Sequence, residues 1–113
     1  MFEINIGIIH AQYIVALLQR DQQLRIKLQE KQKILLIDSY QNGREQGLIV
    51  WGFRKHIGYY ICEGRRTDSI VIYKGELAMQ GISENAYANS EYFDQNNAFG
   101  AYKWLVNDII SEL

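Results

Sequence analysis

The first third of the chain carries apolar residues at helical spacing. Helical steps of three, four and seven residues lead from Ile14 to Leu17 and Leu18, from Leu17 to Leu24, and from Leu24 to Leu28. Such steps place side chains on one face of a helix, so we predict a helix from about residue 8 to about residue 32. Residues 24–28 also alternate between apolar and polar, and a strand is therefore the alternative there. Residues 2–6 alternate as well, which indicates either a short strand or the lead-in to the helix.

Between residues 33 and 74 the pattern changes to short apolar runs separated by short polar turns. The runs are ILLIDSY at 34–40, GLIVWGF at 47–53, GYYIC at 58–62 and SIVIY at 69–73. Strands of this length joined by turns of a few residues are typical of an antiparallel meander. We predict three to four such strands, and residues 91–93 fit a short extra one.

The last segment returns to helical spacing. Asp94 precedes it and is suited to cap a helix, because its carboxylate accepts the N–H groups that the first turn leaves unpaired. The helix then runs to the C-terminus with one broad apolar face. The whole pattern predicts a two-layer α+β fold, with helices from both chain ends covering one face of the meander. Residues 1–113 are expected to form one domain.

Composition and charge exclude few classes of function. The chain has 113 residues, 48% of them hydrophobic and 22% charged, and its formal net charge is −1. This balance does not select for nucleic acid or for an anionic membrane. Cys62 is the only cysteine, so no internal disulfide is available, and we expect a cytoplasmic protein. The apolar N-terminal run contains polar residues and fits core structure better than a membrane span or signal peptide.

The sequence offers few candidate residues for catalysis or for binding a cofactor or metal ion. A lone cysteine within a strand is best interpreted as a small buried hydrophobe, and His10 as a partly buried helix residue. The glycines fall at turns and form no phosphate-binding loop. We therefore expect no catalytic site, no cofactor and no metal ion.

Three arginines are the candidate anion site. Successive turns of a meander alternate between the two ends of the sheet, so the turn with Arg44 and the turn with Arg65 and Arg66 share one end. Arginine binds phosphate and carboxylate groups in a bidentate manner. A solvated turn explains the same residues. The hypothesis that follows is an accessory nucleic-acid-binding protein.

Two features favour a protein partner instead. The chain has two tryptophans and eight tyrosines, residue types enriched at interfaces, and Tyr87, Tyr92 and Tyr102 gather near the last helix. A continuous first helix would also extend beyond the sheet and leave Leu24 and Leu28 for a second copy to cover. The leading hypothesis is a small non-enzymatic interaction module, such as an adaptor, inhibitor or regulatory subunit, that self-associates through the first helix or a sheet edge.

Overall fold

The computed structural model describes residues 10–39, 45–51, 56–63, 69–77 and 87–113, without the side chains of 38, 39, 49, 51, 77, 87 and 88. In chain order the elements are α1 (His10–Gln19), α2 (Gln22–Glu30), β1 (Ile34–Ser39), β2 (Glu45–Trp51), β3 (His56–Glu63), β4 (Ser69–Leu77), β5 (Tyr87–Asp94), the 3-10 helix η2 (Gln95–Asn97) and α3 (Ala98–Ser111). The α+β prediction is confirmed. The strand predicted at residues 2–6 lies outside the described residues.

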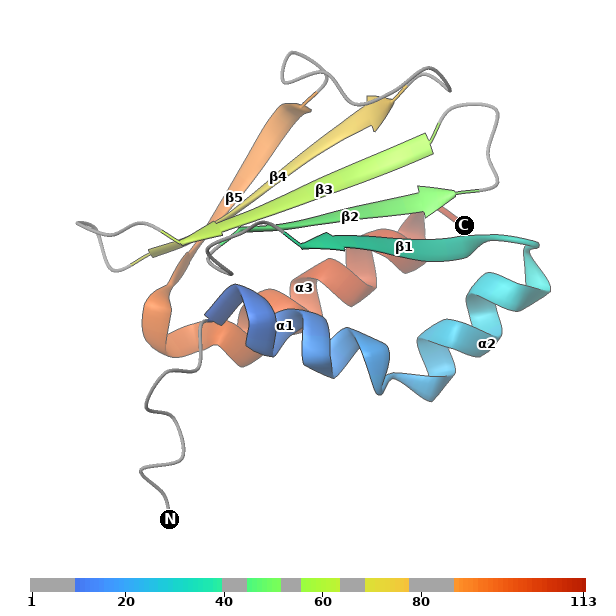
Figure 1. Cartoon of the computed structure of the whole chain (residues 1–113), viewed down its shortest axis with the longest axis horizontal. Helices are drawn as coiled ribbons and strands as arrows, with labels where there is room; N and C mark the ends of the chain where they lie inside the picture. The colour runs from blue at the N-terminus through green and yellow to red at the C-terminus, as the bar shows by residue number, and fades with distance from the viewer. Residues whose placement is uncertain (1–9, 40–44, 52–55, 64–68, 78–86) are drawn as a thin grey trace.

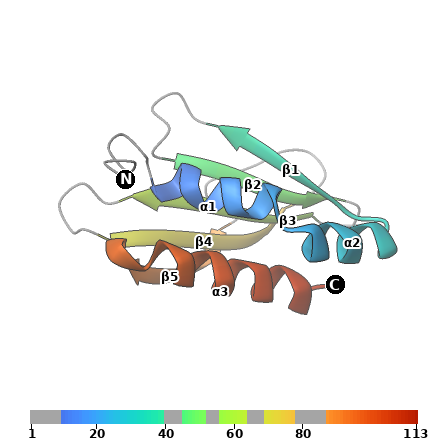
Figure 2. The ribbon, with the colours of Figure 1, turned by 90° about the horizontal axis from the view of Figure 1, so that it is seen from below.

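The five strands form one antiparallel meander in the order β1-β2-β3-β4-β5. The helices lie together on one face of this sheet (Figures 1 and 2). The sheet has one strand more than predicted, because residues 87–94 pair with β4 over their whole length rather than at 91–93 alone. Because the meander has five strands, an odd number, β1 and β5 run parallel to each other. Each of them has a neighbour on one side only within the described sheet.

The core lies between the sheet and the helices, and its members alternate along each strand as the period of two requires. Its buried side chains include Ile14 and Leu18 from α1, Leu24 from α2, Leu48, Tyr59, Ile61 and Ile72 from the sheet, and Leu105 and Ile109 from α3. α1 packs beneath β2 and β3 and against α3, whereas α2 packs beneath β1. The two-layer prediction is therefore confirmed.

The predicted single first helix is wrong, because the structure has two. Asp21 adopts an extended conformation (φ −81°, ψ 95°), and its carboxylate accepts the Leu24 N–H at 2.9 Å. This cap starts a new helix and turns the chain back toward the sheet. As a result Leu24 and Leu28 are 1% and 5% exposed and pack against the chain itself. The overhang that would have needed a second copy as cover does not exist.

α2 ends in a Schellman motif that lacks the usual glycine. The Lys33 N–H donates to the Leu28 carbonyl at 2.8 Å, and the Gln32 N–H donates to the Gln29 carbonyl at 3.0 Å. Gln32 holds the left-handed position with φ 57°, which glycine occupies at lower cost. This turn places the first residue of β1 directly beside the end of α2.

Two successive caps start the last helix. Asp94 accepts the Asn96 N–H at 2.8 Å and so begins η2, and Asn97 accepts the Gly100 N–H at 3.2 Å and begins α3. Asp94 is thus a cap, as predicted, but of the short 3-10 turn rather than of the α-helix.

Candidate functional site

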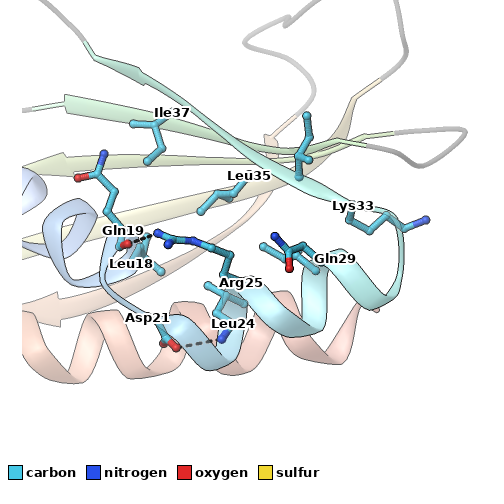
Figure 3. Close-up of a pocket in the computed structure, with 11 residues that line it drawn as sticks. Leu18, Gln19, Asp21, Leu24, Arg25, Gln29, Lys33, Leu35 and Ile37 are labelled. Carbon is cyan, nitrogen blue, oxygen red and sulfur yellow. Dashed lines mark hydrogen bonds between the residues drawn. The ribbon is translucent and has the colours of Figure 1, made fainter.

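A groove of about 230 Å³ runs between β1 and the two N-terminal helices. We call it the edge groove. Its apolar lining comes from one strand and two helices that converge there: Leu18, Leu24, Leu28, Ile34, Leu35 and Ile37. Figure 3 shows Leu35 and Ile37 projecting from β1 toward the helices, with Arg25 between the strand and α1. Alternation along β1 sends Leu35 and Ile37 into this groove because they pair with Val50 and Leu48 of the core face.

Polar groups surround the apolar lining. The polar lining consists of Gln19, Asp21, Arg25, Gln29 and Lys33, and both Asp21 carboxylate oxygens already accept hydrogen bonds within the chain. The Arg25 guanidinium donates to the Gln19 carbonyl, and among the described residues no carboxylate pairs with it. A guanidinium has five N–H donors in a rigid fork that matches a carboxylate. Arg25 therefore has donors left for a ligand that enters the groove.

The other face of β1 is apolar and open to solvent. Leu36 is 43% exposed on this face, and Ile34, which also lines the groove, is 53% exposed. Ile26, on the outer side of α2, is 54% exposed. Three of the six exposed large hydrophobic side chains of the described residues thus lie on β1 or α2. Exposed apolar side chains on an unpaired edge strand form a template for another strand, and isolated proteins usually avoid it.

The outer edge of β1 also has free hydrogen-bonding groups. Within the described sheet β1 pairs only with β2, so alternate backbone N–H and C=O groups point away from the sheet. A second strand can join these groups while its side chains alternate between the edge groove and the open face.

Asp21 holds the groove in place. One carboxylate oxygen caps α2, and the other accepts the Tyr102 hydroxyl at 2.6 Å, which ties the α1–α2 junction to α3. The hydrogen bond to Asp21, together with burial, raises the pKa of Tyr102 to about 12. Tyr102 thus ties α3 to the α1–α2 junction that borders the groove, and its predicted place in a protein interface stays a prediction.

A second polar cluster ties α3 to the sheet. The buried Tyr59 hydroxyl donates to Asp108 at 2.8 Å, and the Lys74 ammonium lies 2.9 Å from Asp108 and 3.1 Å from Glu112. Burial and the bond to Asp108 raise the pKa of Tyr59 above its ordinary value. Burial alone would lower the pKa of Lys74, but its hydrogen bonds with Asp108 and Glu112 raise it. The three charged groups satisfy one another, so this cluster is structural.

The histidine and cysteine considered for chemistry do not come together. His10 starts α1, where its N–H and its Nδ1 contact the same oxygen of Glu63 at 3.0 Å and 2.7 Å. Glu63 and Cys62 are neighbours in β3, so their side chains point to opposite faces of the sheet. Burial raises the pKa of Cys62 to about 12, and its thiol therefore stays protonated at neutral pH.

The sequence-predicted candidates fall in different places. Arg44, Arg65 and Arg66 lie outside the described residues, and so does the side chain of Tyr87, whose backbone belongs to β5. Tyr92 is 66% exposed on β5, at the opposite edge of the sheet from the groove. The structure brings Leu24, Leu28 and Tyr102 together around Asp21, but it keeps Tyr92 apart from them.

Sequence reasoning missed Arg25, Leu35 and Ile37 as site residues. The alternation in ILLI at 34–37 placed two of these side chains on a common face. What it did not show was that the first strand is an edge and that α2 folds back beside it.

The chain matches no protein-family model, no curated protein and no solved structure. Among the residues that the structure describes, no helix is long and apolar enough to cross a membrane, and no three metal-binding side chains cluster. The edge groove is therefore the feature of the described residues from which a function can be inferred.

Proposed function

We propose that this protein is a non-enzymatic interaction module that binds an extended, acidic polypeptide segment along β1. The observation that carries the proposal is the outer edge of β1, which pairs with no further strand among the described residues and borders an apolar groove that contains Arg25. Strand addition of this kind draws affinity from main-chain hydrogen bonds and specificity from pockets that accept alternate side chains.

The charge of this region supports an acidic segment. Residues 22–39, which span α2 and β1, carry four cations and two carboxylates, although the whole chain is close to neutral. We call residues 22–39 the basic edge. A carboxylate entering the groove meets the exposed Arg25 guanidinium, and a charge-assisted, bidentate hydrogen bond between these two groups is stronger than one between neutral groups. A basic segment would meet like charge instead.

Two synthetic peptides test the proposal. Both have eight residues with valine at alternate positions, and the remaining positions are glutamate in one peptide and lysine in the other. Titration of the ¹⁵N-labelled protein with the glutamate peptide should shift amide resonances mainly in β1 and α2, and the lysine peptide should leave them unchanged. Perturbation of other strands, or equal response to both peptides, would contradict the proposal.

Matched variants locate the binding surface. Leu36→Lys places a charge on the open face of the β1 edge and should weaken binding of the glutamate peptide at least about tenfold, because edge lysines oppose strand addition. Tyr92→Lys makes the same change on the other edge strand and should leave binding intact. A single-stranded oligonucleotide that bound more tightly than the glutamate peptide would favour the nucleic-acid hypothesis instead.

A further inference from the structure

The opposite edge of the sheet has the chemistry that the basic edge is suited to receive. Residues 87–113, which span β5, η2 and α3, carry four carboxylates and one cation. Asp108 and Glu112 pair with Lys74 and Asp94 caps η2, so Glu91 is the carboxylate of this segment that remains for a partner among the described residues. We call them the acidic edge. Within the described sheet β5 pairs only with β4, so it presents a second row of free backbone groups. The two edges lie on opposite sides of the molecule (Figure 1).

Side chains on β5 are also sorted between two faces. Glu91 pairs with Ile72 and therefore lies on the helix-covered face, whereas Tyr92 pairs with Val71 and lies on the open face. Both are exposed, and Glu91 has no hydrogen-bond or ion-pair partner among the described residues. β5 therefore exposes a tyrosine and an unpaired carboxylate on an edge that no other described strand covers, and a further strand can pair with it there.

The two edges match face by face. β1 and β5 run parallel, so β5 of one copy can lie beside β1 of another with both helical layers on the same side of a continuous sheet. Glu91 then belongs to the face of the edge groove, where Arg25 lies, and Tyr92 belongs to the face of Ile34 and Leu36. Charge meets opposite charge, and apolar surface meets apolar surface.

The symmetric alternatives match less well. A two-fold dimer through β1 would bring two basic edges together, and one through β5 would bring two acidic edges together. Like charges placed side by side across a strand pair oppose association. Electrostatic complementarity thus favours contact between unlike edges.

We infer that β5 of a second copy of this chain occupies the β1 edge, so that the protein assembles head to tail. This inference rests on the proposed function, because it names the occupant of the same site. A contact between two different surfaces leaves one free edge of each kind at the ends, and the assembly closes into a ring or grows as a filament.

The decisive experiment uses two variants of the full chain, each blocked at one edge. Leu36→Lys blocks β1 and Tyr92→Lys blocks β5, and both positions are exposed enough to tolerate lysine. Sedimentation velocity at low salt should show the wild type growing beyond a dimer as concentration rises. Each variant alone should be monomeric. Their equimolar mixture should form dimers and nothing larger, because only one productive junction remains.

Other outcomes overturn the inference in distinguishable ways. Dimers of Tyr92→Lys alone would show two-fold pairing through β1, and dimers of Leu36→Lys alone would show two-fold pairing through β5. A wild type that stays monomeric at every concentration would overturn self-assembly, whereas binding of the glutamate peptide would still uphold the proposed function. Loss of both would overturn the two proposals together.

A charge exchange checks the Arg25–Glu91 contact separately. Arg25→Glu and Glu91→Arg should each weaken association about tenfold, as expected for a close charge pair. The double variant, which restores opposite charges across every junction, should recover most of the loss. If the double variant is weaker than both single variants, the two residues do not meet.

Discussion

The two edges of the sheet are backed by helices that are held in very different ways. α3 contributes buried Leu105 and Ile109 to the core, and Tyr59 and Lys74 bind its Asp108 from the sheet. α2 contributes only two buried leucines, and a groove remains between it and β1. The same two-layer fold therefore packs α3 closely against the sheet at the β5 edge and leaves a groove between α2 and the sheet at the β1 edge.

The largest expected difference between the edges is in core packing. Leu105→Ala should lower the free energy of unfolding by roughly 3–5 kcal/mol, because it opens a cavity in the sealed layer. Leu28→Ala should cost roughly 2–3 kcal/mol, since the neighbouring groove already leaves that side chain partly without contacts. Urea denaturation measures both values. Equal costs would mean that α2 is packed as tightly as α3.

The hydrogen bond between Tyr59 and Asp108 should contribute less to the free energy of unfolding than the buried apolar side chains of α3. Tyr59→Phe removes the donor to Asp108 and should cost about 1–2 kcal/mol in the same denaturation experiment, because the partly buried carboxylate loses a hydrogen bond. Tyr92→Phe is the matched control on an exposed tyrosine and should change little. A neutral Tyr59→Phe would show that Lys74 alone satisfies Asp108.

The turn after α2 offers a substitution that stabilises the weaker edge. Gln32→Gly should raise the free energy of unfolding by about 1 kcal/mol, because glycine adopts φ 57° without steric cost. Gln29→Gly, three residues earlier within the helix, should lower it by about the same amount. Opposite signs for the two glycines, measured by urea denaturation, would confirm the left-handed position. Destabilisation by both would contradict it.

The last effect appears only at high pH and concerns the hydrogen bond between Tyr102 of α3 and Asp21 at the α1–α2 junction. The pKa of Tyr102 rises from 10.0 to about 12 on folding. A raised pKa in the folded state means that the neutral hydroxyl contributes stability that is complete below pH 10 and is lost as the pH rises toward about 12. Tyr102→Phe should therefore flatten the decline in stability across this window, while the slope that belongs to Tyr59 remains. An unchanged decline would show that the bond to Asp21 is not maintained in solution.

The sequence predicted the meander well because its signals are local. Residues 34–37 and 69–73 are short β-rich runs, and polar turns separate them from their neighbours. The predicted length of the fifth strand was too short because YANSEYF at 87–93 alternates only weakly between apolar and polar residues. Its full length depends on its pairing with β4, which is a tertiary contact. The sequence pattern did not reveal the break between α1 and α2 because the residues around Asp21 are good helix formers. The helical spacing of apolar residues therefore continues past Asp21, although one helix ends just before it and its side chain caps the next.

The candidate site was less accessible to sequence reasoning than the fold. The pattern identified Leu24 and Leu28 as unusual, but for the wrong reason, since it assumed a continuous helix. Arg25 and Leu35 are ten positions apart and belong to different elements. Only the fold-back of α2 places both side chains along one groove.

By itself the sequence determined that helical segments flank a meander, which faces are apolar and how charge is distributed along the chain, because these depend on neighbours a few residues apart. The tertiary structure alone decided that the basic and acidic segments would lie at the two opposite edges of the described sheet. Strand order and helix placement result from packing between distant residues, and no local pattern encodes which strand is left without a neighbour.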